Sequence, residues 1–202
     1  MSDEPTSRAG ATRTKLLAAA RRVFEADGYD GASISRIVEQ AEVARGTFYL
    51  YFDSKEAVVR ALASELTFEV VELQRTPGDT GTPLDNLSDL IARYVAYYRE
   101  HAVFMAVLEQ VATHDEGFRA LRRDMRRGVA VAAIAFVERQ QDLGTVPRTV
   151  AARPAGVALT GMVDRFLYVW LVLGERFDED EVVTTLSRLW WQAIGGTVDA
   201  DR

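Results

Sequence analysis

The sequence of 202 residues contains no cysteine and only two histidines, His101 and His114. Without cysteine there can be no disulfide framework, no cysteine nucleophile and no thiolate metal site, and the cytoplasm is the simplest expected location. A glycine-rich phosphate loop and a nucleophile motif are missing as well. The sequence therefore predicts no catalytic residue, no metal site and no cofactor.

Long hydrophobic runs are also missing. The longest purely apolar run covers residues 129–137, far short of the roughly 20 residues that a membrane-spanning helix needs. The first ten residues, MSDEPTSRAG, are acidic and polar, whereas an export signal is basic and then apolar. We therefore expect a soluble protein that has no membrane partner.

The net charge is −6, which argues mildly against a protein that coats nucleic acid non-specifically. Residues 1–60 hold 9 basic and 9 acidic residues, which leaves 15 basic and 21 acidic residues for the rest of the chain. The first 60 residues are thus neutral, and they can bind DNA only if their basic groups face one way.

Helical periodicity is what the sequence has in abundance. Apolar residues recur at spacings of three and four, and we find no strand-like alternation. The pairs Asp53/Glu56 and Asp178/Glu181 have the spacing of capping boxes at helix starts. We predict helices over about 16–28, 34–41, 45–52, 54–75, 84–101, 103–111, 115–141, 154–174 and 179–194.

Residues 33–55, SISRIVEQAEVARGTFYLYFDSK, have the pattern of a helix-turn-helix. Ser33 can cap a first helix that carries one apolar stripe. After a turn at Glu42, the rings of Phe48 and Phe52 are four residues apart and can pack against that stripe. The opposite face then points outward, as in a helix that enters a DNA major groove. That face consists of Arg45, Gly46, Thr47 and Tyr49.

The segment ARGTFYLYFDSKEAV resembles the DNA-binding signature of the tetracycline-repressor-like (TetR) family, and the resemblance covers about residues 12–60. It implies an all-α protein with an N-terminal helix-turn-helix DNA-binding domain and a helical-bundle domain for ligand binding and dimerisation. We expect a disordered lead at 1–10, the DNA-binding domain at 11–56 and the second domain at 57–202. The implied function is a ligand-responsive homodimeric repressor that binds a palindromic double-stranded DNA operator.

By this resemblance, Arg45, Gly46 and Thr47 are expected in the major groove, where Arg45 can hold a guanine edge through two hydrogen bonds. Phosphate contacts are expected from Ser33, Ser35, Tyr49, Tyr51 and Lys55. Two alternatives stay open: the tyrosines pack beside the phenylalanines, and Lys55 is an ordinary exposed lysine.

The family usually has Gly in the turn, where this chain has Glu42. If Glu42 takes a positive φ, the side chain costs about 1 kcal/mol.

The second domain is expected to enclose a largely apolar pocket for a small effector. Its apolar candidates are Phe68, Tyr94, Tyr97, Tyr98, Phe104, Met105, Leu108, Phe118, Met125, Met162, Phe166 and Trp170. Asp164 and Arg165 could supply polar groups. Arg165 favours an anionic or acyl effector, and an internal pair with Asp164 is the alternative. For each apolar residue the alternative is ordinary core packing.

The last two helices carry more apolar surface than one subunit can cover, which predicts a two-fold dimer with a four-helix interface. The candidate interface residues are Val157, Leu186, Leu189, Trp190 and Ile194. The four arginines between 122 and 127 are interpreted as a solvated helix face rather than a second DNA-binding patch.

Two other classes of function stay open. An enzyme or metal protein would combine the two histidines with Glu100, Glu109, Asp115 and Glu116. Histidines that only hydrogen-bond at helix ends are the simpler interpretation. A structural adaptor would explain the helical body but not the outward Arg-Gly-Thr-x-Tyr face.

Overall fold

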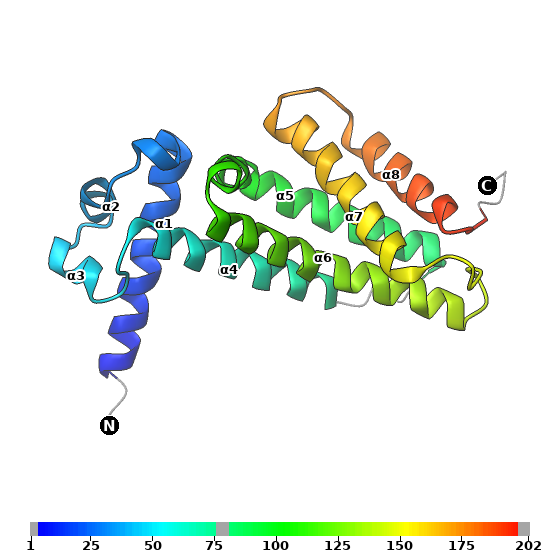
Figure 1. Ribbon diagram of the computed structural model, residues 1–202, viewed down its shortest axis with the longest axis horizontal. Coiled ribbons are helices and arrows are strands. Elements are labelled where there is room, and N and C mark those ends of the chain that lie inside the picture. The colour runs from blue at the N-terminus through cyan, green and yellow to red at the C-terminus, as the bar shows by residue number, and fades with distance from the viewer. Residues whose placement is uncertain (1–3, 76–80, 198–202) are drawn as a thin grey trace. The chain divides into compact units, whose positions relative to one another are not determined.

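The computed structural model describes residues 4–75 and 81–197, and within these ranges all regular structure is helical (Figure 1). The predicted all-α fold is confirmed. The elements are α1 (Glu4–Gly31), α2 (Ile34–Gln40), α3 (Arg45–Tyr49), α4 (Lys55–Arg75), α5 (Pro83–His114), α6 (Glu116–Asp142), α7 (Ala152–Leu167), the π-helix η1 (Tyr168–Val172) and α8 (Glu179–Ala193).

The chain divides into two compact units. The first unit comprises residues 1–66 and 103–122, and the second unit comprises residues 67–102 and 123–202. The divisions fall inside α4, α5 and α6, so each of these helices contributes to both units. The predicted boundary after residue 56 lies earlier in α4 than the division at residue 66.

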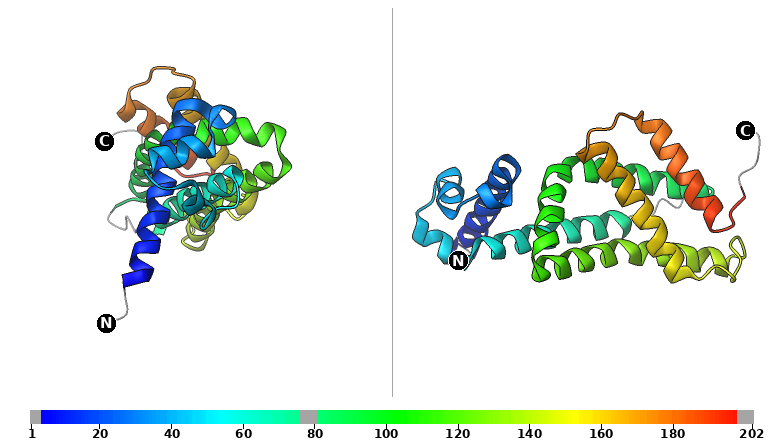
Figure 2. Two further views of the ribbon diagram at one scale, coloured as in Figure 1. Left: turned by 90° about the vertical axis from the view of Figure 1, so that its left-hand side faces the viewer. Right: turned by 45° about the horizontal axis from the view of Figure 1, so that its top comes forward.

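In the first unit, α2 packs against α1 and α3 packs against α2 (Figures 1 and 2). Their common core contains the fully buried side chains of Leu16, Phe24, Ile37 and Phe48. Helices of seven and five residues are too short to be stable alone, so this shared core is what holds α2 and α3 in place.

The first helix is longer than predicted and is kinked. Gly28 has φ 68°, a left-handed conformation that favours glycine, and it interrupts the helical backbone before the end at Gly31. The sequence therefore marked a real break at Gly28, although the chain turns helical again after it. Residues 4–10, predicted to be a disordered lead, belong to α1.

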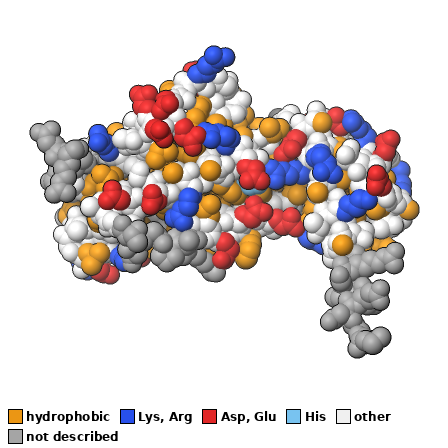
Figure 3. Space-filling view, turned by 180° about the vertical axis from the view of Figure 1, so that it is seen from behind, with side chains coloured by type: hydrophobic (Ala, Val, Ile, Leu, Met, Phe, Trp, Pro, Cys, Tyr) orange, Lys and Arg blue, Asp and Glu red, His pale blue; other side chains and the backbone are white. Residues whose placement is uncertain are grey.

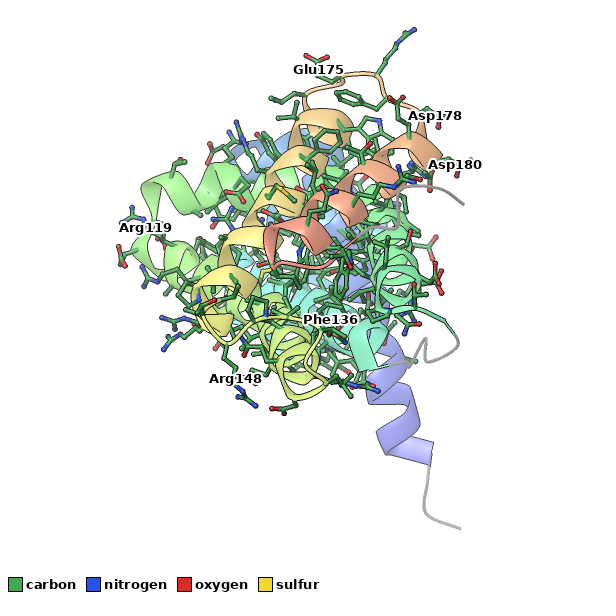
Figure 4. The ribbon with its side chains drawn as sticks, turned by 90° about the vertical axis from the view of Figure 1, so that its right-hand side faces the viewer. Arg119, Phe136, Arg148, Glu175, Asp178 and Asp180 are labelled. Atoms are coloured by element: carbon green, nitrogen blue, oxygen red, sulfur yellow. The ribbon has the colours of Figure 1, made fainter. Side chains whose placement is uncertain are left out.

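The second unit is a bundle of helices whose core includes close contacts between α6, α7 and α8. A Cβ atom on Gly156 of α7 would lie 2.9 Å from the backbone nitrogen of Ile134, so glycine is what lets α7 approach α6 this closely. Phe136 on α6 meets the rings of Trp190 and Trp191 on α8 at centroid distances of 5.5 and 6.4 Å (Figure 4). These contacts hold the ends of the chain's last two long helices onto α6.

The predicted helix end near His101 is wrong, because α5 runs without a break from Pro83 to His114. His101 is buried in mid-helix, with its Nε2 3.3 Å from a carboxylate oxygen of Glu69 and its ring against Tyr97. A polar residue inside a helix can thus be a core residue with its own partners. Sequence spacing alone does not separate that case from a helix end.

The helix caps were predicted correctly in two of three cases. Ser33 accepts a hydrogen bond from the backbone of Arg36, and Asp178 accepts one from Glu181. At α4, however, the capping oxygen belongs to Ser54 and not to Asp53, because the Ala57 amide donates to the Ser54 hydroxyl over 3.2 Å.

The segment Ala152–Val172, which covers α7 and η1, is long and apolar enough to cross a membrane by length and composition alone. Only 28% of its apolar window is buried within the chain. Core helices of soluble proteins meet the same length and composition criteria. The observation that matters for the site is the large exposed part of this apolar helix.

Candidate nucleic-acid interface

The turn between α2 and α3 contains a residue with a positive φ, at the position where the family usually has glycine. Glu42 has φ 50°, the left-handed conformation, although it is not glycine. The Val43 amide donates to the Val38 carbonyl over 3.0 Å and closes the turn. The Glu42 carboxylate pairs at the surface with Lys15 of α1 over 3.1 Å.

One face of α3 faces the core of the first unit and the other faces solvent. Phe48 and Phe52 are buried and their ring centroids are 5.8 Å apart. The predicted inward face is therefore confirmed. Arg45, Gly46 and Tyr49 are exposed on the remaining surface, together with Leu50, which the sequence analysis did not single out.

Gly46 lies at the centre of this exposed surface. A Cβ atom placed on it would meet no heavy atom within 4 Å among the described residues, apart from the neighbouring backbone of its own helix. Its backbone is ordinary right-handed helix, so neither conformation nor internal packing explains a glycine here. The backbone of α3 is therefore accessible from outside at this point.

The polar groups predicted to contact DNA come from both helices of the motif. Arg45 Nη1 on α3 donates to the Ser35 hydroxyl on α2 over 3.3 Å, so these two side chains lie side by side at the surface. Ser33 caps α2 and is exposed, while Thr47 and Tyr51 are half-buried. Tyr49 contacts Phe48 edge-on but keeps an exposed ring.

Lys55 is placed differently from the other candidates. Its Nζ donates to the carbonyls of Tyr29 and Ala32 over 2.7 and 3.1 Å and lies 4.1 Å from the centroid of the Tyr29 ring. The ammonium group therefore binds the backbone where α1 ends. Lys55 is therefore not an ordinary exposed lysine, and its phosphate contact stays a prediction.

Sequence reasoning missed the partner of Lys55 in this junction. The Tyr29 hydroxyl donates to the carboxylate of Glu56 over 2.6 Å, and the Tyr29 ring meets Phe118 edge-on at 5.6 Å. Burial raises the pKa of Tyr29, and the hydrogen bond from Tyr29 lowers the pKa of Glu56. The two groups thus favour a neutral phenol and a charged carboxylate, and they fix the start of α4 against the end of α1.

Basic side chains of the first unit are largely engaged with carboxylates. Arg13 pairs with Glu65, and Arg36 pairs with Asp27. On the face that Figure 3 shows, Lys and Arg side chains are interspersed with Asp and Glu. Binding by this unit must therefore rely on a few well-placed groups more than on bulk charge.

The predicted pocket residues belong to two different units. Phe104, Met105, Leu108 and Phe118 are buried in the first unit, where the Phe104 ring lies 6.4 Å from that of Phe24. In the second unit the structure buries Tyr94, Tyr97, Tyr98, Met125 and Trp170, and it half-buries Met162 and Phe166. Phe68 is 67% exposed, because it lies on the side of α4 that faces solvent.

Aromatic residues of the second unit form two groups. Tyr94 lies 6.1 Å from both Tyr97 and Tyr98 on α5. Phe166 and Trp170 instead meet Phe177, which comes from the loop that carries Glu175 and Asp178 outward (Figure 4). Arg165 is exposed and lies over the ring of Tyr168 at 5.0 Å. In the part of the chain that the structure describes, no three His, Asp or Glu side chains are placed to hold a metal ion.

The five predicted dimer residues are not equally accessible. Val157 and Leu189 are 53% and 49% exposed. Leu186, Trp190 and Ile194 are buried within the chain, because they occupy the side of α8 and its C-terminal end that faces inward. Val157 and Leu189 are therefore the predicted interface residues whose side chains are accessible at the surface of the second unit.

Both halves of the chain match models of known protein families. Residues 16–62 match the model for bacterial regulatory proteins of the tetR family, and residues 88–196 match the model for the C-terminal domain of the transcriptional regulator EthR. The EthR protein of Mycobacterium tuberculosis is 28% identical over 187 residues, which span 90% of this chain and 86% of that protein.

Solved structures share the fold at lower sequence identity. The fatty acid degradation regulator FadR of Bacillus halodurans has a TM-score of 0.79 at 20% identity, covering 98% of this chain and 100% of that one. The FadR of Bacillus subtilis, whose structure was determined in complex with stearoyl-CoA, has a TM-score of 0.76 at 20% identity, covering 92% of this chain and 99% of that one.

Proposed function

Because this chain belongs to the tetR family of transcriptional regulators, we propose that it is a homodimeric, cytoplasmic repressor without enzymatic activity. In this proposal it binds a palindromic operator through α3 and leaves the operator when a small acyl effector binds the helical bundle. The helix-turn-helix and the all-helical body are features that the chain shares with its relatives.

The observation that carries the proposal is the exposed face of α3. Gly46 leaves the backbone accessible there, and the adjacent Arg45 side chain donates a hydrogen bond to the Ser35 hydroxyl. An arginine can bind a guanine edge through two hydrogen bonds, and a bare backbone allows the helix to sit deep in the major groove. Thr47 is assigned to bases, and phosphates are assigned to Ser33, Ser35, Tyr49 and Tyr51.

The role of Lys55 in DNA binding follows from its contacts. Its ammonium holds the carbonyls of Tyr29 and Ala32, so its first effect is on the position of α4 relative to α1. A phosphate contact uses the third ammonium hydrogen. We therefore assign Lys55 chiefly as a positioning residue, with the phosphate as an additional partner.

The dimer proposal rests on α7 and α8. Val157 and Leu189 are exposed, and most of the apolar window of α7 and η1 is exposed as well. Pairing these faces about a two-fold axis would bury them and form a four-helix interface. The two copies of α3 would then have to meet half-sites about 34–36 Å apart on the duplex.

The effector proposal is supported by two observations. The Bacillus subtilis neighbour was solved with stearoyl-CoA, and the second unit of this chain contains large buried aromatic and methionine side chains. An effector shifts the DNA-bound population only if it prefers the DNA-incompetent state. Because α4, α5 and α6 each contribute to both units, a shift of these helices is the route that we propose.

Selection of genomic fragments by the full-length protein tests this function. We expect enriched fragments that share a palindrome, a dimeric mass at micromolar concentration, and release of the fragments by long-chain acyl compounds. Binding that is equally strong to random duplex and that falls only with salt would contradict operator recognition. A monomer that binds the palindrome with full affinity would contradict the dimer.

A further inference from the structure

The exposed surface of α3 includes an apolar side chain to which the proposed DNA contacts give no role. Leu50 directly follows the last residue of α3, and its backbone keeps the helical conformation, with φ −74° and ψ −19°. Its side chain is 81% exposed, a larger fraction than for any other large apolar side chain in the part of the chain that the structure describes. A single exposed leucine is common on protein surfaces, so exposure alone assigns no role to Leu50.

The place of Leu50 on the helix is more informative. The Phe52 amide donates to the Phe48 carbonyl over 3.0 Å, so the α-helical hydrogen-bonding pattern extends past Leu50. Leu50 is two residues from each phenylalanine, and at 3.6 residues per turn it points about 160° away from both. Both phenylalanines are buried. Leu50 therefore lies on the side of the helix opposite the core, the side that reaches farthest outward.

Gly46 lies one turn before Leu50 on this outward side. Residues four apart are neighbours on a helix surface. Because Gly46 has no side chain and a Cβ atom there would find open space, the preceding turn leaves Leu50 accessible. By the same geometry Arg45 and Tyr49 lie on one flank of Leu50, where both are exposed, and Thr47 lies half-buried on the other flank. Polar groups thus flank an apolar side chain at the outermost point of α3.

An apolar side chain at this point has a specific partner in the major groove. Thymine presents its C5 methyl group there, whereas the other three bases present hydrogen-bonding groups. Contact between a leucine and this methyl group removes apolar surface of both from water. A leucine side chain has no hydrogen-bonding group, so a phosphate offers it no comparable interaction. The chemistry of Leu50 therefore matches a base edge better than the DNA backbone.

We propose that Leu50 recognises a thymine in each half-site of the operator through contact with the C5 methyl group. The inference rests on the proposed operator binding by α3, and it names a base other than the guanine assigned to Arg45. Arg45 discriminates through hydrogen bonds, and Leu50 discriminates through apolar contact. The two residues are about 7.5 Å apart along the helix axis, so the guanine and the thymine are expected within about three base pairs of each other.

The test uses the operator duplex obtained by selection of genomic fragments, and copies in which one thymidine of each half-site is replaced by deoxyuridine. This exchange removes the C5 methyl group and keeps every hydrogen-bonding group of the base pair. For the full-length wild type, we expect a position at which the exchange weakens binding about fifteenfold, because one buried methyl group contributes about fourfold in each half-site. Leu50→Ala should bind the unmodified operator at least about tenfold more weakly, and exchange at that position should weaken its binding no further.

Three further variants serve as controls. Leu50→Met keeps a long apolar side chain and should retain the deoxyuridine effect. Arg45→Ala should bind the operator more weakly but also retain this effect, because Arg45 reads another base. Val103 on α5 is a 54% exposed apolar residue of the same unit, so Val103→Ala should match the wild type on every duplex.

Each result has a defined meaning. If exchange of thymine weakens the wild type at no position, or weakens Leu50→Ala as much as the wild type at every position, the inference is overturned and operator recognition stands. An equal loss of affinity by Leu50→Ala on the operator and on random duplex also overturns it, because the contact would then not be specific for a base. If the fragments selected by the wild type share no sequence, operator recognition and the inference both fall.

Discussion

Gly46 on α3 and Gly156 on α7 are both glycines inside helices, yet the two units use them in opposite ways. A Cβ atom would find open space at Gly46, whereas at Gly156 it would lie 2.9 Å from the backbone of Ile134. Neither residue has a positive φ, so backbone conformation explains neither glycine. The first glycine leaves room outside the protein, and the second leaves room for another helix of the same chain.

The candidate sites of the two units differ in the same way, because one is a surface and the other is formed where helices pack together. In the first unit the candidate site is a surface, formed by neighbouring residues of a short motif that a small core holds in place. In the second unit the predicted effector site consists of side chains from several helices, such as Tyr94 on α5 and Asp164 on α7, which are joined by a hydrogen bond of 3.4 Å. Substitutions in the first unit should therefore change DNA binding, and substitutions in the second should change stability, assembly or effector binding.

The largest expected effect is on the stability of the second unit. Trp190→Ala should lower the free energy of unfolding by about 3–5 kcal/mol, because it removes a buried ring that packs on Phe136. Leu189→Ala, on the exposed side of α8, should change subunit stability by less than about 0.5 kcal/mol and weaken dimerisation instead. Urea unfolding at fixed protein concentration and analytical ultracentrifugation separate the two outcomes. Equal destabilisation by both substitutions would remove the distinction between core and interface.

The two glycines allow a direct comparison of the units. Gly156→Ala should destabilise the protein by about 1–3 kcal/mol, because the new methyl group meets the backbone of Ile134. Gly46→Ala should stabilise the fold by about 0.5–1 kcal/mol, because alanine favours a helix, and it should weaken operator binding. Thermal unfolding and a gel-shift titration measure both properties. Unchanged operator affinity in Gly46→Ala would show that the open backbone is not used for DNA.

The sequence predicted local features of the first unit well. The pairing of Phe48 with Phe52 and the cap at Ser33 follow from spacings within a few residues, whereas the positive φ of Glu42 was raised only as a condition, from the glycine that the family usually has in the turn. It did not predict that Lys55 binds the end of α1 or that Tyr29 binds Glu56. Those partners are on different helices, and helical spacing carries no information about which helices meet.

The same limit explains the misses in the rest of the chain. His101 was interpreted as a helix end, because the sequence does not show that Glu69 and Tyr97 provide it with buried partners. The interpretation of the α6 arginines as one solvated face is wrong for Arg122, which is buried and pairs with Glu109 over 2.7 Å. Its partner lies on α5, and that of Arg126, Asp164, lies on α7, so helical spacing did not show either. The cap of α5 has a local signal in the sequence, because Thr82 is followed three residues later by Asp85.

A smaller effect is expected at the turn of the helix-turn-helix. Glu42→Gly should stabilise the protein by up to about 1 kcal/mol, because relief of the left-handed strain exceeds the greater chain entropy of glycine. Glu42→Gln keeps the strain and removes only an exposed ion pair with Lys15, so it should have little effect. Chemical denaturation compares the variants. A loss of stability in Glu42→Gly would mean that the side chain contributes more than its conformation costs.

The smallest effect concerns the pH dependence of stability. A hydrogen bond from the Thr82 hydroxyl lowers the pKa of Asp85. Because the pKa is lowered in the folded state, the contribution is present above the unfolded-state pKa of about 3.9 and is lost as the pH falls through the folded value. Asp85→Asn and Thr82→Ala should both flatten the stability profile in this acidic range. A profile identical to that of the wild type would assign the acid sensitivity to other carboxylates.

The measurement that tests the central claim most directly compares wild type and Arg45→Ala on a selected operator and on random duplex of equal length at fixed salt. Loss of a base contact made by Arg45 should cost about 1–3 kcal/mol on the operator, relax the preference at one base pair of each half-site, and leave random duplex nearly unchanged. An equal loss on both duplexes would reduce Arg45 to a phosphate contact. No loss on either would show that the outward face of α3 does not recognise DNA.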